Sequence, residues 1–319
     1  MTKTLISFVT VSLVALSFTG CGGGGSSDNG NKTSDSISFP SNATVAAPTP
    51  ENADKVAKTV VTDPTSSITS LGINNISADK TVSSMQLLKK STDILHTSLK
   101  KHPLDNIALN EAVNETVKCE DGGSIQFNGS GSEATGGTIT ITYQECKEYS
   151  STINGKIKVV QSNYNSDADE YITTNINFLT DFNVNTNQSY NFSYKAGSYI
   201  NEKIIAFSDS NGYKHPSNIA IDTSYIITMN EMKFGLKDCK FNFKYSDNGD
   251  LEYIQTQGRI YIDNTLANYV DVDTAYSPAI DFFYKYNNLD SGIGHYIMGD
   301  AKKLTITATG NGEYTTTFE

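Results

Sequence analysis

Apolar and polar residues alternate with a period of two along most of the chain after Cys119. Successive side chains of a strand point to opposite faces of its sheet, so this period predicts strands with one buried face and one wet face. The clearest examples are Thr138–Tyr143, Lys156–Val159, Tyr171–Leu179, Phe241–Tyr245 and Leu304–Ala308.

Glycine-containing pairs separate these segments and predict tight turns, because Asn-Gly tolerates the positive φ angles that hairpin turns require. They are Gly136-Gly137, Asn154-Gly155, Asn211-Gly212, Asn248-Gly249 and Asn311-Gly312. Parallel strands would need crossover helices, and no helical period lies between the segments. We therefore expect a mainly β protein with an antiparallel sheet, arranged as a sandwich or a half-barrel.

A helical period precedes the strands. Val82, Met85, Leu88, Leu95 and Leu99 recur at spacings of three, four and seven residues. This stripe predicts one N-terminal α-helix over about 80–101 that packs against the sheet. A helix that binds a partner or lies on a membrane is the alternative.

The first residues of the chain have a different pattern. Lys3 precedes an apolar run from Leu5 to Phe18, and Thr19-Gly20 then lead to Cys21. This resembles the signal peptide of bacterial lipoproteins, although Phe18 stands where that family has Leu, Val or Ile. This run of fourteen residues is too short to span a hydrocarbon core of about 30 Å.

The resemblance implies a cellular location and a membrane anchor. Residues 1–20 would be removed, Cys21 would carry a diacylglycerol, and its new amino group would receive a fatty acid such as palmitate. Gly22 would be the second residue of the mature chain, a position where an aspartate retains such proteins in the inner membrane. We expect lipid anchoring at the bacterial outer membrane, facing either the periplasm or the cell surface.

Residues 21–75 are predicted to be the lipidated cysteine and a flexible linker, because glycine, serine, asparagine and threonine dominate and large apolar residues are few. The β-rich domain is then expected to cover 76–319, with strands from about Cys119. The net charge of −11 and the single arginine, Arg259, argue against nucleic acid as a partner, since phosphate backbones require clustered basic residues.

Three cysteines remain for an oxidising compartment. We expect a disulfide between Cys119 and Cys146, which flank two segments that pair as a hairpin-like unit, and the rival pairing is Cys146–Cys239. A weak repeat bears on this choice: Ile141–Cys146 followed by Asn154–Val159 is similar to Phe234–Cys239 followed by Gln257–Ile262. Cys119 has no counterpart in the second copy, which leaves Cys239 outside the disulfide.

The segment Cys119-Glu120-Asp121-Gly122-Gly123, followed by Cys146 and Asn154-Gly155, also resembles a pattern in uncharacterised β-rich bacterial lipoproteins. A C-terminal segment from Gly292 to Phe318 is similar too. This resemblance implies no activity, because none is assigned to that group.

The sequence contains none of the constellations that enzymes need, so we expect no catalytic residue, no metal and no cofactor. There is no Gly-x-Ser-x-Gly elbow and no phosphate-binding glycine loop. Asn165–Glu170 has alternating oxygen side chains, but Glu170 and Ile176 stand at the positions that need Gly and Glu in a calcium loop, so an exposed acidic loop is expected.

We expect a non-enzymatic envelope lipoprotein that acts as a structural or binding protein. Its partners would be the membrane, through the N-terminal lipid, and an envelope protein, a glycan or a lipid. The alternatives are a carrier of an apolar or lipid ligand in a curved-sheet groove, and a hydrolase with dispersed acids such as Asp263, Asp271 and Asp273. Tyrosines and phenylalanines are numerous and could line a sugar or peptide site, but they are more typical of the core here.

Overall fold

The structure is a computed structural model. It describes residues 37–60, 113–132, 136–148, 151–168, 170–186, 191–210, 213–229, 232–247, 251–263, 265–273, 281–285, 288–310 and 312–319. Its elements are β1 (Thr44–Val45), α1 (Pro50–Val60), β2 (Val113–Lys118), β3 (Ser124–Ser132), β4 (Gly136–Glu148), β5 (Ser151–Asn165), β6 (Glu170–Phe178), β7 (Phe182–Thr186), β8 (Asn191–Tyr194), β9 (Tyr199–Ser210), β10 (Tyr213–Met229), β11 (Met232–Tyr245), β12 (Leu251–Tyr261), β13 (Asn268–Val272), β14 (Asp281–Lys285), β15 (Asn288–Ile297), the short 3-10 helix η2 (Gly299–Ala301), β16 (Lys303–Gly310) and β17 (Glu313–Phe318). The predicted mainly β architecture is confirmed.

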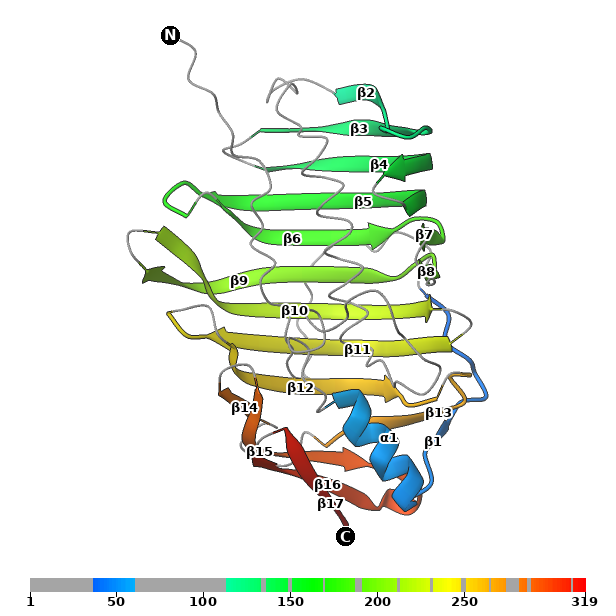
Figure 1. Cartoon of the computed structure of the whole chain (residues 1–319), viewed down its shortest axis with the longest axis vertical. Helices are drawn as coiled ribbons and strands as arrows, with labels where there is room; N and C mark the ends of the chain where they lie inside the picture. The colour runs from blue at the N-terminus through cyan, green and yellow to red at the C-terminus, as the bar shows by residue number, and fades with distance from the viewer. Residues whose placement is uncertain are drawn as a thin grey trace.

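The strands form one large sheet that runs the length of the molecule (Figure 1). Strands β2 to β6 are successive antiparallel neighbours, β6 pairs with β9, and β9 to β12 continue in the same way. Both β13 and β14 pair with β12 and with β15, and β16 and β17 complete the sheet. Strands β7 and β8 connect β5 to β10 beside this series, and β1 pairs with β13 in parallel.

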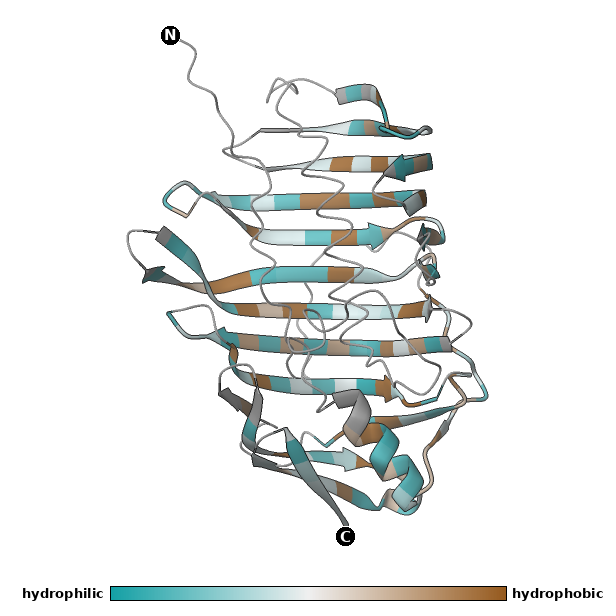
Figure 2. Ribbon diagram, viewed as in Figure 1, coloured by the Kyte–Doolittle hydropathy of each residue, from teal (hydrophilic) through white to brown (hydrophobic). Residues whose placement is uncertain are grey.

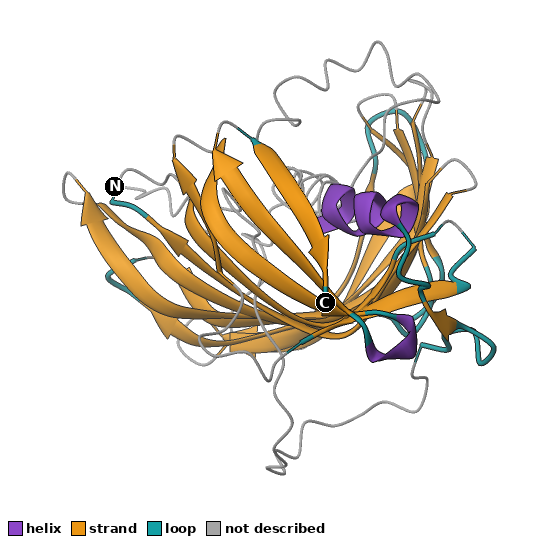
Figure 3. Ribbon diagram, turned by 90° about the horizontal axis from the view of Figure 1, so that it is seen from below, coloured by secondary structure: helices purple, strands orange, loops and turns teal. Residues whose placement is uncertain are grey.

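The sheet is curved, and α1 lies inside the curve (Figure 3). Apolar residues alternate with polar ones along the strands (Figure 2). The apolar set is buried in one core cluster with Ala53, Val56 and Ala57 of α1, which places it on the concave face. Ile141, Ile176, Ile221, Phe241 and Ile306 belong to this core. The convex face carries the intervening polar residues. The single curved sheet agrees with the half-barrel expectation rather than with the sandwich.

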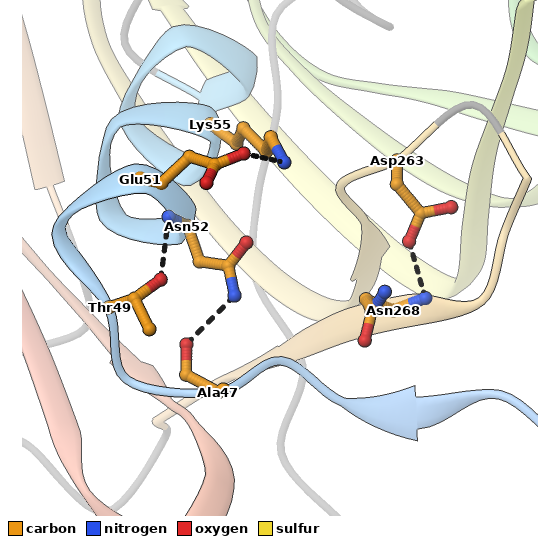
Figure 4. A network of polar contacts seen from close by, with 7 residues as sticks. All are labelled: Ala47, Thr49, Glu51, Asn52, Lys55, Asp263 and Asn268. Atoms are coloured by element: carbon orange, nitrogen blue, oxygen red, sulfur yellow. Dashed lines mark hydrogen bonds and ion pairs between the residues drawn. The ribbon is translucent and has the colours of Figure 1, made fainter.

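Residues 37–60 correct the expected linker of 21–75, because they contain β1 and α1. Thr49 caps α1 by accepting a hydrogen bond from the Asn52 backbone N–H at 3.2 Å (Figure 4). Pro50 suits the first helical position. Ala53, Val56 and Ala57 follow at helical spacing and are fully buried against the concave core. Three small apolar residues on one helix face are enough to dock the segment, which a count of large apolar residues misses.

Polar contacts order the segment that contains β1 and α1 and the turn before β13, and backbone hydrogen bonds from Thr44 to Ala267 and from Ala46 to Tyr269 join the two. The Asn52 side chain donates to the Ala47 carbonyl at 2.9 Å, and Asp263 accepts from the backbone N–H of Asn268 (Figure 4). Thr44 and Asn268 are directly paired between β1 and β13. The expected helix over 80–101 lies outside the described residues, as does Cys21.

Asn154-Gly155 corrects a second expectation, because it lies within β5 and not in a turn. Gly155 has φ 131°, and the added Cβ of any other residue would lie 2.8 Å from the Asp181 carbonyl oxygen. Residues before this point pair with β7 and residues after it pair with β6. The glycine therefore lets one long strand change from pairing with β7 to pairing with β6. The positive φ angle that allows this is the property that a tight turn would also need.

Candidate functional site: an amide-lined groove on the convex face

The predicted disulfide is confirmed. Cys119 and Cys146 are joined; they are 27 positions apart in sequence and their Cα atoms lie 5.4 Å apart. The rival pairing of Cys146 with Cys239 is wrong, because Cys239 is a buried thiol on β11 whose Sγ lies 3.3 Å from the Arg259 carbonyl oxygen. The bridge joins the turn that directly follows β2 to the last residues of β4 and thus stabilises this end of the sheet.

The two repeat copies share a β-bulge directly before the cysteine. Glu145 and Asp238 each precede a cysteine, and each has a positive φ, 46° and 51°, at a bulge. In the first copy Lys156 pairs with Thr142, the second residue of Ile141–Cys146. In the second copy its counterpart Arg259 pairs with Lys237, the fourth residue of Phe234–Cys239. The copies therefore share the bulge but not the register of their strands.

The acidic residues considered for hydrolysis hold structural contacts. Asp271 forms a bidentate pair with Arg259 at 2.8 and 3.0 Å. Asp273 pairs with Lys303 at 3.2 Å. Asp263 accepts hydrogen bonds from the turn that precedes β13, so the three carboxylates serve three different contacts.

The acidic loop that follows β5 is also committed to local structure. Asn165 accepts hydrogen bonds from the backbone N–H groups of Asp167 and Ala168. Asp167 pairs with Lys214 at 3.0 Å. Within the described residues, no group of three or more His, Cys, Asp or Glu is arranged to hold a metal ion.

A groove of about 530 Å³ lies over β6, β9, β10, β11 and β12. Most of its lining residues occupy the polar positions of these strands, which alternate with the buried core positions, and the exposed Ile205 lies among them. Its side chains come from strand positions that face each other in register. One row is formed by Asn175, Asn201, Asp222, Lys240 and Gln257, and the next row by Thr173, Lys203, Ala220, Asn242 and Gln255.

Carboxamide oxygens without donors distinguish this groove from an ordinary wet face. Asn218 Oδ1, Asn242 Oδ1 and Gln257 Oε1 are buried and have no hydrogen-bond partner among the described residues. A buried acceptor left without a donor costs about 1–3 kcal/mol. All three oxygens belong to residues that line the same groove. The groove therefore offers acceptors that a bound molecule with O–H or N–H groups would satisfy.

Charged groups of both signs complete the groove. Burial raises the pKa of Asp222, and the Tyr199 hydroxyl, which donates to Asp222 Oδ1 at 3.2 Å, and the Lys240 charge oppose that rise. Burial also raises the pKa of Tyr199, so this hydroxyl remains a donor. Lys203 and Lys240 supply exposed ammonium donors. The site thus presents donors, acceptors and a carboxylate within one surface.

Sequence reasoning missed this groove. Its Asn, Gln, Lys and Thr residues occupy the polar positions of alternating strands, which is the ordinary signature of a solvent face. The signal that was available is the amide content of these positions, since Asn175, Asn201, Asn242, Gln255 and Gln257 are all carboxamides. Which of them face one another depends on register, which alternation alone does not give.

Comparison with models of known protein families finds no family that matches this chain, and no curated protein is significantly similar to it. Of the helices in the described parts of the chain, none has the length and apolar character needed to cross a membrane.

Proposed function

We propose that this protein is a lipid-anchored bacterial envelope protein that binds a hydroxyl-rich ligand, such as a glycan, in the amide-lined groove. The observation that carries the proposal is the set of three buried carboxamide oxygens without donors. The tether is supported by the lipoprotein-like signal that ends at Cys21. Acylation there would leave the groove to face the periplasm or the cell surface.

The chemistry of the lining favours hydroxyl groups over other ligands. Carboxamide and carboxylate oxygens need donors, whereas the lysine and carboxamide N–H groups need acceptors. A hydroxyl does both at one atom, and a sugar offers several at short spacing. A phosphate would satisfy Lys203 and Lys240 but would bring its oxygens against Asp222 and the carboxamide oxygens. A peptide pairs most readily with a sheet edge, whereas this groove lies on a sheet face.

Calorimetric titration of the full chain, purified in detergent, with neutral oligosaccharides tests this function. We expect at least one glucan, xylan or chitin oligosaccharide to bind, and the double variant Asn242→Ala/Gln257→Ala to lose about tenfold or more in affinity. Asn177→Ala, on the same convex face but outside the groove lining, is the matched control. Binding that is unchanged in the double variant would place the ligand elsewhere.

Acylation is tested separately. Cys21→Ser should abolish labelling with a palmitate analogue and shift the protein from the detergent phase to the aqueous phase. Retention in the detergent phase with an unchanged mass would contradict the anchoring proposal.

A further inference from the structure

An exposed aromatic pair lies beside the groove on the same face. Phe283 on β14 has 44% of its surface exposed, and its ring centroid lies 6.1 Å from that of Tyr253 on β12. The two residues are directly paired between their strands. Tyr253 is two residues from Gln255, which lines the groove, so the aromatic surface continues the groove toward the C-terminal strands.

The register connects this pair to the acceptors. Asn218 on β10 faces Lys244 on β11, Lys244 faces Tyr253, and Tyr253 faces Phe283. These four residues therefore form a third row beside the two rows of the groove. One end of the row carries a buried carboxamide oxygen without a donor, and the other end carries the aromatic pair. Lys244, between these ends, forms an ion pair with Glu252 at 2.9 Å.

The rows run across the strands, along the long axis of the molecule (Figure 1). Neighbouring strands are about 4.8 Å apart, so the distance from β6 to β14 is about 24 Å over five steps. Each step is comparable to the advance of one hexose unit in an extended chain. The groove thus offers a repeated set of polar contacts at a repeat that suits a linear polymer of sugars.

The polar groove and the aromatic pair match the two kinds of surface that a sugar ring presents. Sugar hydroxyls project from the ring edge and can satisfy the carboxamides and lysines. The C–H face of a pyranose ring is apolar and carries partial positive charge, which suits the negative face of an aromatic ring. The exposed Phe283 beside the polar groove can make that contact. Without a ligand its ring contacts water, which does not stabilise an apolar surface.

We infer that the ligand is a linear oligosaccharide or polysaccharide that lies across the strands, with its hydroxyls in the amide-lined groove and a ring stacked on Tyr253 and Phe283. This inference rests on the proposed function of the groove and specifies the class and direction of its ligand. Tyr253 and Phe283 determine the affinity for long chains, whereas Asn218, Asn242 and Gln257 are needed for chains of every length.

A chain-length series tests this inference with the full chain in detergent. The probes are β-1,4-linked glucose, xylose and N-acetylglucosamine oligomers of about two to six units, a range set by the strand spacing over the site. For the series that binds, affinity should rise with length. Phe283→Ala should lower affinity for the longest oligomer about tenfold and leave the dimer within about twofold, and Phe283→Tyr should keep the wild-type length dependence.

The outcomes separate the inference from the proposed function. If Asn242→Ala/Gln257→Ala weakens binding but Phe283→Ala leaves the length dependence unchanged, the groove binds sugars and the inferred direction is wrong. If Phe283→Ala weakens the dimer and the longest oligomer equally, the aromatic pair does not act as a distant subsite, and the inference fails. If no oligosaccharide binds to the wild-type chain, the proposed function itself fails.

Discussion

The side chains of Asn242 and Gln255 meet across β11 and β12, where Asn242 Nδ2 lies 3.5 Å from Gln255 Oε1 while the Asn242 oxygen has no donor among the described residues. The amide nitrogen of Asn242 therefore makes one long hydrogen bond, and under the proposed function its oxygen would accept a hydrogen bond from the ligand. A buried acceptor without a donor lowers the stability of the empty protein, and a ligand that donates a hydrogen bond to it would offset that loss.

Replacing Asn242 by Leu should separate stability from binding. Leu removes a buried acceptor without a donor and gives up only a long, weak hydrogen bond, so the free energy of unfolding should stay the same or rise by about 1 kcal/mol. Affinity for the oligosaccharide should fall about tenfold or more. Urea unfolding and titration measure the two effects. Asn177→Leu on β6 is the control, and an equal loss of affinity in that variant would contradict the role assigned to Asn242.

Asp263 should stabilise the protein in a pH-dependent way. Burial favours the neutral acid, but hydrogen bonds from Thr265, Ala267 and Asn268 outweigh it and lower the pKa of Asp263 below its ordinary value. The stabilisation is therefore complete above the pKa of an unfolded aspartate and is lost as the pH falls through the folded value.

Two substitutions test this role. Asp263→Ala should lower stability at pH 7 by about 2–4 kcal/mol, because several turn N–H groups lose a charged acceptor. Asp263→Asn should show a smaller loss of stability on acidification than the wild type. Asp209→Asn, exposed on β9, provides the baseline. Identical acid-unfolding curves for the wild type and Asp263→Asn would refute the assignment.

Glu202 should have the opposite pH dependence. It lies on β9 between Ile200 and Ile204, with Thr174 and Ile221 as cross-strand neighbours, and burial raises its pKa to about 7. Between the ordinary glutamate pKa and about 7, the unfolded chain is ionised while the folded protein stays neutral, so stability falls as the pH rises.

The variant Glu202→Gln removes this pH-dependent loss. Relative to the wild type it should gain up to about 3 kcal/mol between pH 4 and pH 8. Glu313→Gln on the exposed part of β17 should track the wild type. Chemical unfolding at several pH values measures the difference, and a constant offset for Glu202→Gln would show that burial does not shift this carboxyl group.

The disulfide should contribute substantially to stability. It joins cysteines that are 27 positions apart, and closing a loop of this length contributes about 3–4 kcal/mol in the chain-entropy description. Cys119→Ser/Cys146→Ser should lower the unfolding free energy by that order, and wild type in reductant should behave in the same way. Cys239→Ser is the control for loss of a thiol. Recovery of a Cys239 disulfide peptide under non-reducing conditions would overturn the pairing.

Helix α1 should be part of the cooperative core. Val56 is fully buried, and an aspartate there would place a charge against the concave face. Val56→Asp should lower the midpoint of thermal unfolding by many degrees, whereas Glu51→Ala, which removes only a solvent-exposed pair with Lys55, should leave the midpoint close to that of the wild type. Equal melting of the two variants would show that α1 folds separately from the sheet.

The strands and the disulfide could be predicted because their signals are local. Thr138–Tyr143 alternates strictly and lies in β4, and Cys119 and Cys146 flank segments that pair as neighbours in the sheet. Helix α1 could not be found in this way, because Ala53, Val56 and Ala57 form a small stripe within a polar composition. Gly155 shows the same limit, since positive φ serves a turn and a change of strand partner equally well.

The groove depends on information that no local pattern contains. Asn175 and Gln257 lie far apart in sequence, and their common row exists only because four successive strand pairings are in register. A one-residue slip in any pairing would turn a carboxamide toward the concave face. The acceptors without donors then appear only once side chains are placed, because a sequence gives residue types and not their hydrogen-bond partners.

The contacts made by residues 44–60 also determine when the chain can finish folding. Thr44 meets Asn268, 224 residues later, and Asp54 meets Tyr314, 260 residues later. In a chain synthesised from its amino terminus, α1 can dock only after β13 and β17 have been made, and such distant pairings form slowly. Docking of residues 44–60 against β13 and β17 is therefore a late step of folding, which requires these C-terminal strands. Truncation within β16 or β17 would leave the amino-terminal segment undocked and accessible to proteases.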